Sequence, residues 1–297
     1  MKRFLNLTAS EMLSLDRKTL KESIKASEGR IILSENIVVD NPPAPDVTSS
    51  EIARSAGADL ILLNLFDVNE PFIRNLGQGS DIIRDLREIV GRPVGVNLEP
   101  VSENANLMET IHKISDGRKA SVDTLKKARE LGFDFVCFTG NPATGVTNAE
   151  ILNAIKIADQ NFGGMIIAGK MHSSGVDEPV VDVEAIREFI DAGADIILIP
   201  AVGTVPGVTD EMVREAIRIA HEKSALTMAS IGTSQESSSP EVIREIALRS
   251  KINGFDIHHM GDGSAGSVSP YLNIIELSRT IRGDRHTMRM MASSIKR

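Results

Sequence analysis

Short apolar runs alternate with amphipathic stretches along most of the chain, and a three-residue phrase of the form Gly-x-Asp marks several of the transitions. It occurs four times, at Gly57–Asp59, Gly132–Asp134, Gly193–Asp195 and Gly254–Asp256. Each copy follows an amphipathic stretch and precedes a short apolar run. Glycine adopts the positive φ that ends a helix, and buried parallel strands are short apolar runs. The phrase therefore predicts a turn from a helix into a strand.

The spacing of the phrase indicates eight strands. Its last three copies are 61 residues apart, whereas one strand–helix unit needs about 30 residues. Further apolar runs lie before the first copy, at 30–38, and in each of the three intervals, at 93–98, 164–168 and 226–231. Together with the runs that follow the phrase (60–65, 135–138, 196–199 and 257–258), these predict a (β/α)₈ TIM barrel. An open doubly wound sheet is the alternative, but it gives no reason for such even repetition.

The whole chain, 1–297, is expected to form this single domain. Thr8-Ala9-Ser10-Glu11 is a capping box that predicts an extra N-terminal helix to about Ala26, so that residues 1–29 cover the N-terminal mouth of the barrel. Residues 283–297 are expected to form a C-terminal tail, either packed or frayed or in contact with another subunit. Two long strand-to-helix connections, 40–49 and 99–120, are candidates for substrate-contacting loops.

Composition narrows the class of protein. Hydrophobic residues make up 41% of the 297 residues and aromatic residues only 3%, which suits an aliphatic barrel core. The net charge of −8 and the scarcity of aromatic side chains argue against nucleic-acid binding. The sequence holds no apolar run long enough to cross a membrane and no signal peptide, so no membrane partner and a cytoplasmic location are expected. The single cysteine, Cys137, lies in an apolar run and reads as buried. A homo-oligomer is expected.

Polar residues at the strand ends supply the candidate chemistry, because these ends converge at one mouth of a barrel. Lys170 and His172 are two residues apart and are expected to face the barrel if Ala168 does. Lys170 could form a Schiff base, hold an anion, or pair with Asp67 or Glu99. His172 could act as a general acid or base, or be a hydrogen-bonded core histidine. Candidate catalytic residues are Lys170, His172, Glu99 and Asp67; candidate substrate-binding residues are Asn97, Asn141 and His258, the last preferred to His259.

A divalent cation is a second hypothesis. Glu35, Asp67 and Glu99 offer the oxygen ligands that Mg²⁺ or Mn²⁺ prefer. The sequence lacks the His-Glu-x-x-His motif, the Gly-x-Ser-x-Gly elbow, the Asp-x-Asp-x-Thr strand end of haloacid dehalogenases and any nucleotide-cofactor motif. The missing motifs argue against the metalloprotease, serine hydrolase, dehalogenase and nucleotide-dependent mechanisms that use them. Metal dependence through residues on different strands stays open.

Two small-residue loops predict a phosphate site. Gly232-Thr233-Ser234 follows the seventh strand, and the loop 261–267 follows the eighth. Backbone N–H groups in such loops approach anions closely, and barrels often bind phosphate there. Asp262 is unfavourable for this interpretation because its charge repels phosphate. The predicted phosphate-binding residues are Gly232, Thr233, Ser234, Gly261, Gly263, Ser264 and Gly266.

This pair of loops resembles the phosphate grip of ribulose-phosphate-binding and related TIM barrels. The resemblance implies a phosphorylated sugar or related metabolite, handled by an aldolase, isomerase, synthase or decarboxylase. Lys170 departs from class I aldolases, which carry the Schiff-base lysine on strand six, because it follows the fifth predicted strand. The leading hypothesis is an enzyme of lyase or isomerase type that acts on a small phosphorylated or anionic carbonyl metabolite. The alternatives are a metal-dependent hydrolase and a non-catalytic barrel that binds a metabolite and reports it to a partner.

Overall fold

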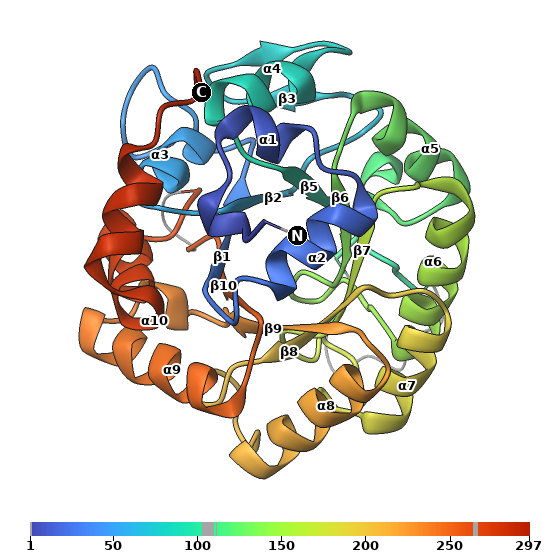
Figure 1. Cartoon of the computed structure of the whole chain (residues 1–297). Helices are drawn as coiled ribbons and strands as arrows, with labels where there is room; N and C mark the ends of the chain where they lie inside the picture. Colours follow the sequence, from blue (N-terminus) through green and yellow to red (C-terminus); the bar gives the residue numbers. More distant parts are fainter. Residues whose placement is uncertain (1, 103–109, 111, 264–266) are drawn as a thin grey trace.

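Eight parallel strands close into a barrel, which confirms the predicted (β/α)₈ architecture (Figure 1). The structure is a computed structural model and describes residues 2–102, 110, 112–263 and 267–297. The hydrogen-bonded strand order around the barrel is β1-β10-β9-β8-β7-β6-β5-β2. The barrel strands are β1 (Ile31–Ile37), β2 (Leu60–Asn64), β5 (Val94–Asn97), β6 (Phe135–Phe138), β7 (Met165–Gly169), β8 (Ile196–Pro200), β9 (Leu226–Ile231) and β10 (Ile257–Met260).

Helices follow the strands and form an outer ring (Figure 1). They are α3 (Ser49–Ser55), α4 (Ile82–Val90), α5 (Val122–Leu131), α6 (Asn148–Asn161), α7 (Val183–Asp191), α8 (Asp210–Glu222), α9 (Pro240–Asn253) and α10 (Tyr271–Ala292), with 3-10 turns η2 (Asp116–Arg118) and η3 (Gln235–Ser237). A small antiparallel hairpin, β3 (Phe72–Ile73) with β4 (Gly77–Gln78), was not anticipated from the sequence. Its two-residue strands are too short to show an alternating pattern.

The Gly-x-Asp phrase forms the same hydrogen-bonded staple four times. Each glycine has a positive φ, between 90° and 115°, as predicted. Each aspartate carboxylate accepts a hydrogen bond from a backbone N–H of the preceding barrel strand, at 2.8–3.0 Å. The aspartate N–H donates to the carbonyl of that same residue. The aspartate–strand pairs are Asp59 with Ile32, Asp134 with Val94, Asp195 with Ile166 and Asp256 with Thr227.

A basic side chain completes each staple from outside the barrel. Asp134 pairs with Arg87, Asp195 with Arg17 and Lys21, and Asp256 with His221. Asp59 pairs with Arg282 at 2.5 Å, and both side chains are fully buried. The repeated phrase thus links neighbouring strands in pairs at the N-terminal end of the barrel and ties them to the surrounding helices.

The N-terminal segment covers the N-terminal mouth of the barrel, as expected (Figure 1). Phe4, Leu20 and Ile24 pack into the same apolar cluster as the interior strand residues. The single helix predicted to Ala26 is instead a short turn, η1 (Phe4–Asn6), and two helices, α1 (Ala9–Leu13) and α2 (Arg17–Lys25). The predicted capping box at Thr8 is present, but Asp16 forms a second one that starts α2 anew.

The C-terminal segment 283–297, expected to be packed, frayed or in contact with another subunit, packs on the barrel and is mostly helical. Gly283, at φ 72° and ψ 170°, kinks α10, and the helix then continues to Ala292. Met290 is fully buried in the interior cluster, whereas Met288 is 65% exposed. This segment packs on the N-terminal end of the barrel. In the part of the chain that the structure describes, no helix has the length and hydropathy needed to cross a membrane.

Strand alternation divides the core into two parts. The interior cluster takes the first residue after each phrase aspartate, namely Leu60, Phe135, Ile196 and Ile257, and also the third residue after Asp59, Asp134 and Asp195. The intervening residues pack outward against the helices, in the second cluster. Side chains that continue the interior phase past the third residue reach the C-terminal mouth. The staples therefore set which alternate residues of a strand face the interior, and so which polar side chains meet at this mouth.

Candidate functional site

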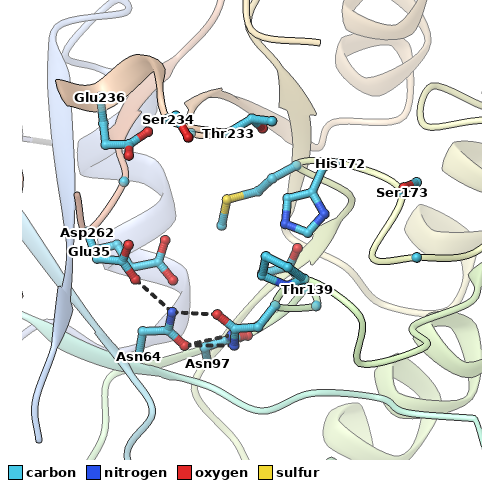
Figure 2. Close-up of a pocket in the computed structure, with 17 residues that line it drawn as sticks. Glu35, Asn64, Asn97, Thr139, His172, Ser173, Thr233, Ser234, Glu236 and Asp262 are labelled. Atoms are coloured by element: carbon cyan, nitrogen blue, oxygen red, sulfur yellow. Dashed lines mark hydrogen bonds between the residues drawn. The ribbon is translucent and has the colours of Figure 1, made fainter. Parts of the chain in front are cut away.

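A cavity of about 380 Å³ opens at the C-terminal mouth of the barrel (Figure 2). Small-molecule sites commonly have volumes of this order. No lysine or arginine is found among the described residues that line it. They are Glu35, Asn64, Asn97, Thr139, Gly140, Asn141, Pro142, Met171, His172, Ser173, Gly175, Gly232, Thr233, Ser234, Glu236, Gly261 and Asp262.

Three asparagines form an amide network on one wall of the pocket (Figure 2). Asn64 at the end of β2 and Asn141 after β6 exchange two hydrogen bonds, at 2.9 and 3.1 Å. The side-chain amide of Asn97, at the end of β5, lies 3.3 Å from Asn64 Oδ1. Asn64 Nδ2 also donates to Asp262 Oδ2 at 2.8 Å. The wall presents amide groups that suit carbonyl and hydroxyl oxygens of a ligand.

Asp262 has an acid–base character that a surface aspartate lacks. Burial raises the pKa of its carboxyl group to about 6, and the charge of Glu35 adds to the increase. The hydrogen bond from Asn64 and the proximity of His259 lower it by less. A carboxyl group with a pKa near 6 can give or take a proton close to neutral pH.

Glu35 is held from beneath by two buried groups. Its Oε2 lies 3.0 Å from Nε2 of His259, and Nδ1 of His259 lies 3.4 Å from Oγ of Ser230. The three residues lie at the ends of adjacent strands, β1, β10 and β9, and all are buried. Glu35 lines the pocket, whereas His259 and Ser230 lie one layer deeper. The contacts from Ser230 to His259 and from His259 to Glu35 fix the orientation of the Glu35 carboxylate.

Glu236 lies above Asp262 and Glu35, in the turn η3 (Figure 2). Burial raises the pKa of its carboxyl group; backbone N–H groups of Glu236 and Ser234 lower it, and the charge of Asp262 raises it. Thr233 and Ser234 have φ values of 59° and 71°, and turns of left-handed residues can form concave sites for anions. The carboxylate of Glu236 already occupies part of this turn.

The structure brings together some predicted residues and separates others. Asn97, Asn141 and His172 line the pocket, and His172 Nδ1 accepts a hydrogen bond from the Ser174 N–H at 2.9 Å. Glu99 lies behind the wall, where it accepts from Arg118 at 2.6 Å and from the Asn141 N–H at 2.8 Å. Asp67 accepts from the N–H groups of Asn69 and Glu70 in a turn away from the pocket. Glu99 is therefore placed to position Asn141, not to contact a ligand.

The expected orientation of Lys170 was wrong. Ala168 packs outward with the helices, because β7 places Met165 and Ile167 inside the barrel. Lys170 also faces outward, and it lines a small cavity together with Ile186 and Phe189 of α7. Its ammonium group pairs with Glu178 Oε2 at 2.6 Å, and its side chain is 1% exposed. Glu178 also accepts from the Asn148 N–H, so this pair ties the loop after β7 to the start of α6.

The preference for His258 over His259 was wrong for the same reason. His258 faces outward, hydrogen-bonds to the Gly29 carbonyl at 3.1 Å, and does not line the pocket. Burial lowers its pKa to about 4. His259 faces the barrel interior beneath Glu35. The two histidines are neighbours in sequence on opposite faces of β10.

The predicted metal set does not converge. Glu35 lines the pocket, but Asp67 and Glu99 lie elsewhere, in the contacts given above. Throughout residues 2–102, 110, 112–263 and 267–297, no three His, Cys, Asp or Glu side chains meet in an arrangement that could hold a metal ion.

The predicted phosphate loops are partly described. Gly232, Thr233, Ser234 and Gly261 line the pocket. Gly263, with φ 64°, packs near the backbone of Ser269 and does not line it. Ser264 and Gly266 lie outside the described residues. Residues 40–48 contribute nothing to the described lining, so the loop after β1 does not contact this pocket.

Four residues of the site were not among the catalytic or binding residues predicted from the sequence. Asn64 and Asp262 link the amide wall to the acidic side, and His259 supports Glu35. The repeated strand phase would have selected His259, which is the third residue after Asp256. Glu236 lies in a polar turn whose sequence carries no signal that separates it from solvated glutamates.

Comparison with protein families places the chain. Residues 5–297 match a family described as a domain of unknown function, DUF7916. The chain belongs to this family. No curated protein matches the sequence.

One solved structure supports the fold, and two others are more distantly similar. An archaeal fructose 1,6-bisphosphate aldolase is similar with a TM-score of 0.55 and 15% sequence identity, over 87% of this chain and 96% of the aldolase chain. Thiamine phosphate pyrophosphorylase from Pyrococcus furiosus has a TM-score of 0.49 and 15% identity, over 86% and 97%. A 2,3-dimethylmalate lyase of the PEP mutase/isocitrate lyase superfamily has 0.49 and 16%, over 86% and 81%. At 15% identity, the likeness to the aldolase concerns the fold alone.

Proposed function

We propose that the protein is an enzyme of lyase or isomerase type that moves protons on a small hydroxylated carbonyl metabolite. One observation carries the proposal: Asp262, whose pKa is raised to about 6, and Glu35, anchored by His259, face one amide-lined pocket. Two carboxyl groups in different environments can divide the roles of acid and base. Barrel enzymes carry their active sites at this end of the strands.

In the proposed reaction, Glu35 removes the proton from the carbon next to the carbonyl group. His259 is a positioning residue, since it holds Glu35 and lies beneath the pocket. The amides of Asn64, Asn97 and Asn141 hold the carbonyl and hydroxyl oxygens, and Asp262 delivers or accepts the proton on oxygen. In isomerisation, Glu35 returns the abstracted proton to the neighbouring carbon. In aldol cleavage the transfers run in the opposite sense: Asp262 accepts the proton of the β-hydroxyl group, the carbon–carbon bond breaks, and protonated Glu35 delivers a proton to the carbon next to the carbonyl group. The electrostatic and proton-transfer contributions each supply about 10²–10⁴-fold in enzymes.

The phosphate part of the sequence hypothesis has weaker support than the acid–base part. The similar archaeal aldolase acts, by its name, on a phosphorylated sugar, but a likeness at 15% identity leaves the substrate of this chain open. The Gly232–Ser234 turn lines the pocket, but Glu236 lines it as well, and its carboxylate would repel a phosphate group. A Schiff-base role for Lys170 loses its support because its ammonium group is paired with Glu178 outside the pocket.

The test is solvent-proton exchange. The full chain is incubated in D₂O with a panel of small hydroxylated aldehydes and ketones, and deuterium entering the carbon next to the carbonyl is followed by ¹H NMR. We expect exchange with at least one compound, reduced about 10²-fold or more in Glu35→Gln and unchanged in Glu215→Gln. Glu215 is an exposed residue of α8 and serves as the matched control. Exchange that survives in folded Glu35→Gln contradicts the proposal.

A further inference from the structure

The pocket has an excess of negative charge. Glu35, Glu236 and Asp262 line it, and no lysine or arginine is among its described lining residues. The charge of Glu35 raises the pKa of Asp262, and the charge of Asp262 raises the pKa of Glu236, so Asp262 is close enough to both glutamates to repel each of them. His259 offsets part of this, from beneath Glu35. A ligand that brings positive charge would relieve the remaining repulsion.

Two buried polar atoms in the lining have no partner in the structure. Glu236 is 4% exposed; backbone N–H groups of Ser234 and Glu236 stabilise its carboxylate, but its Oε2 accepts no hydrogen bond. Thr139 is 1% exposed, and its Oγ1 is likewise unpartnered. Buried carboxylate and hydroxyl oxygens without partners are rare, because each loses its hydration without compensation. The position of Glu236 on the pocket wall indicates that a donor from a bound ligand fills this need (Figure 2).

The kind of donor follows from the geometry. A single metal ion needs ligand oxygens gathered at about 2.0–2.6 Å, and no three acidic or histidine side chains of the described residues are so arranged. A phosphate group would meet the charge of Glu236 at the turn where its oxygens should bind. A protonated amine offers three N–H donors and makes short hydrogen bonds to carboxylates. It does not require several ligand oxygens gathered around one point, as a metal ion does.

We infer that the metabolite carries a protonated primary amine, which binds Glu236 beside Asp262 while its carbonyl and hydroxyl oxygens face the amides of Asn64, Asn97 and Asn141. The inference rests on the proposed function, since it names the substrate class of the same pocket. It makes Glu236 the specificity-determining residue, and it replaces the phosphorylated substrate expected from the sequence with an amine-bearing one such as an amino sugar.

The test compares matched ligands on the full chain at pH 7.5. The probes are D-glucosamine, D-glucose and D-glucose 6-phosphate, with serinol, glycerol and glycerol 3-phosphate as a second set; Mg²⁺ and inorganic phosphate are added alone. Binding is followed by ligand-observed NMR and thermal shift. We expect the amine of at least one set to bind tenfold or more tightly than its hydroxyl and phosphate counterparts. This preference should disappear in Glu236→Gln and persist in Glu215→Gln, with Glu236→Ala as the second variant should Gln fail to fold.

Three results would overturn the inference: tightest binding by the phosphates, stabilisation by Mg²⁺ alone, or no amine preference that depends on Glu236. The deuterium exchange assay separates this from the proposed function. If exchange depends on Glu35 but occurs only with neutral or phosphorylated carbonyl compounds, the proposed function is supported and the inference of an amine-bearing substrate is contradicted. If amines bind in a way that depends on Glu236 but no amine-bearing carbonyl compound undergoes exchange, the inferred ligand class is supported and the proposed reaction is contradicted.

Discussion

His259 Nε2 lies 3.0 Å from Glu35 Oε2, and this contact joins the first and last strands of the barrel beneath the pocket. His258, the preceding residue, points the other way and bonds to the Gly29 carbonyl. The two neighbouring histidines thus form a matched pair, since one supports the pocket and the other supports the outer wall.

Replacing His259 by Asn should lower kcat for deuterium exchange by about 10- to 100-fold, because a carboxylate misplaced by about 1 Å loses rate of that order. KM should change by less than about threefold, since His259 does not line the pocket. His258→Asn should leave kcat unchanged. Steady-state kinetics on both variants, with thermal melting as the control for folding, checks this. Equal losses of kcat in the two variants would remove the positioning role of His259.

Replacing Asp262 by Asn should change the pH dependence of stability. The folded pKa of Asp262, about 6, lies above the value near 3.9 of an unfolded aspartate. As the pH falls from about 6.5 to 4, the folded protein takes up a proton that the unfolded chain does not, so this group adds stability to the wild type. The free energy of unfolding of Asp262→Asn relative to wild type should therefore be roughly 2–3 kcal/mol higher at pH 7 than at pH 4. Urea unfolding at both pH values measures it; a constant difference would contradict the raised pKa.

The four staples should differ in strength according to their burial. Asp59 and Arg282 are both fully buried, so Asp59→Asn leaves an uncompensated guanidinium and should lower the free energy of unfolding by about 3–5 kcal/mol. His221, the partner of Asp256, is 42% exposed, so Asp256→Asn should cost about 1 kcal/mol or less. Chemical denaturation of the two variants compares them. Similar costs at both positions would show that the backbone hydrogen bonds, not the ion pairs, set the strength of the staple.

Lys170→Met should destabilise the protein without affecting the chemistry. The substitution leaves Glu178 without its buried cation and loosens the loop that leads to α6. Removal of one partner of such a pair costs about 3 kcal/mol, and less where the other partner, like Glu178, is partly exposed. Exchange activity of the folded variant should stay within about twofold of wild type. Trapping of a substrate on Lys170 by borohydride would contradict this placement.

The strands and their order could be predicted from the sequence because the Gly-x-Asp phrase carries both the turn and the staple. The phrase also sets which residues face the interior in the four strands that follow it, since the residue after every phrase aspartate faces the interior. Had this phase been extended along the chain, His259 would have been preferred to His258. For β7, which lacks the phrase, the phase had to be assumed, and the assumption that Ala168 faces inward misplaced Lys170.

Other parts of the site depend on contacts that no local pattern encodes. Asp67 and Glu99 are acidic residues near strand ends, as Glu35 is, yet turn N–H groups and Arg118 satisfy them away from the pocket. Glu236 reaches the pocket because Thr233 and Ser234 take positive φ values in the loop after β9. The balance of charge at the mouth is therefore a property of the folded loops.

The central claim is that Asp262 and Glu35 transfer protons in this pocket. The pH profile of the deuterium exchange rate, measured from pH 4.5 to 8.5 in wild type and in Asp262→Asn, tests it most directly. We predict a limb in the wild-type profile with a midpoint near pH 6, which corresponds to the carboxyl group of Asp262, and its loss in the variant. A limb near pH 6 that persists unchanged in folded Asp262→Asn would contradict the account.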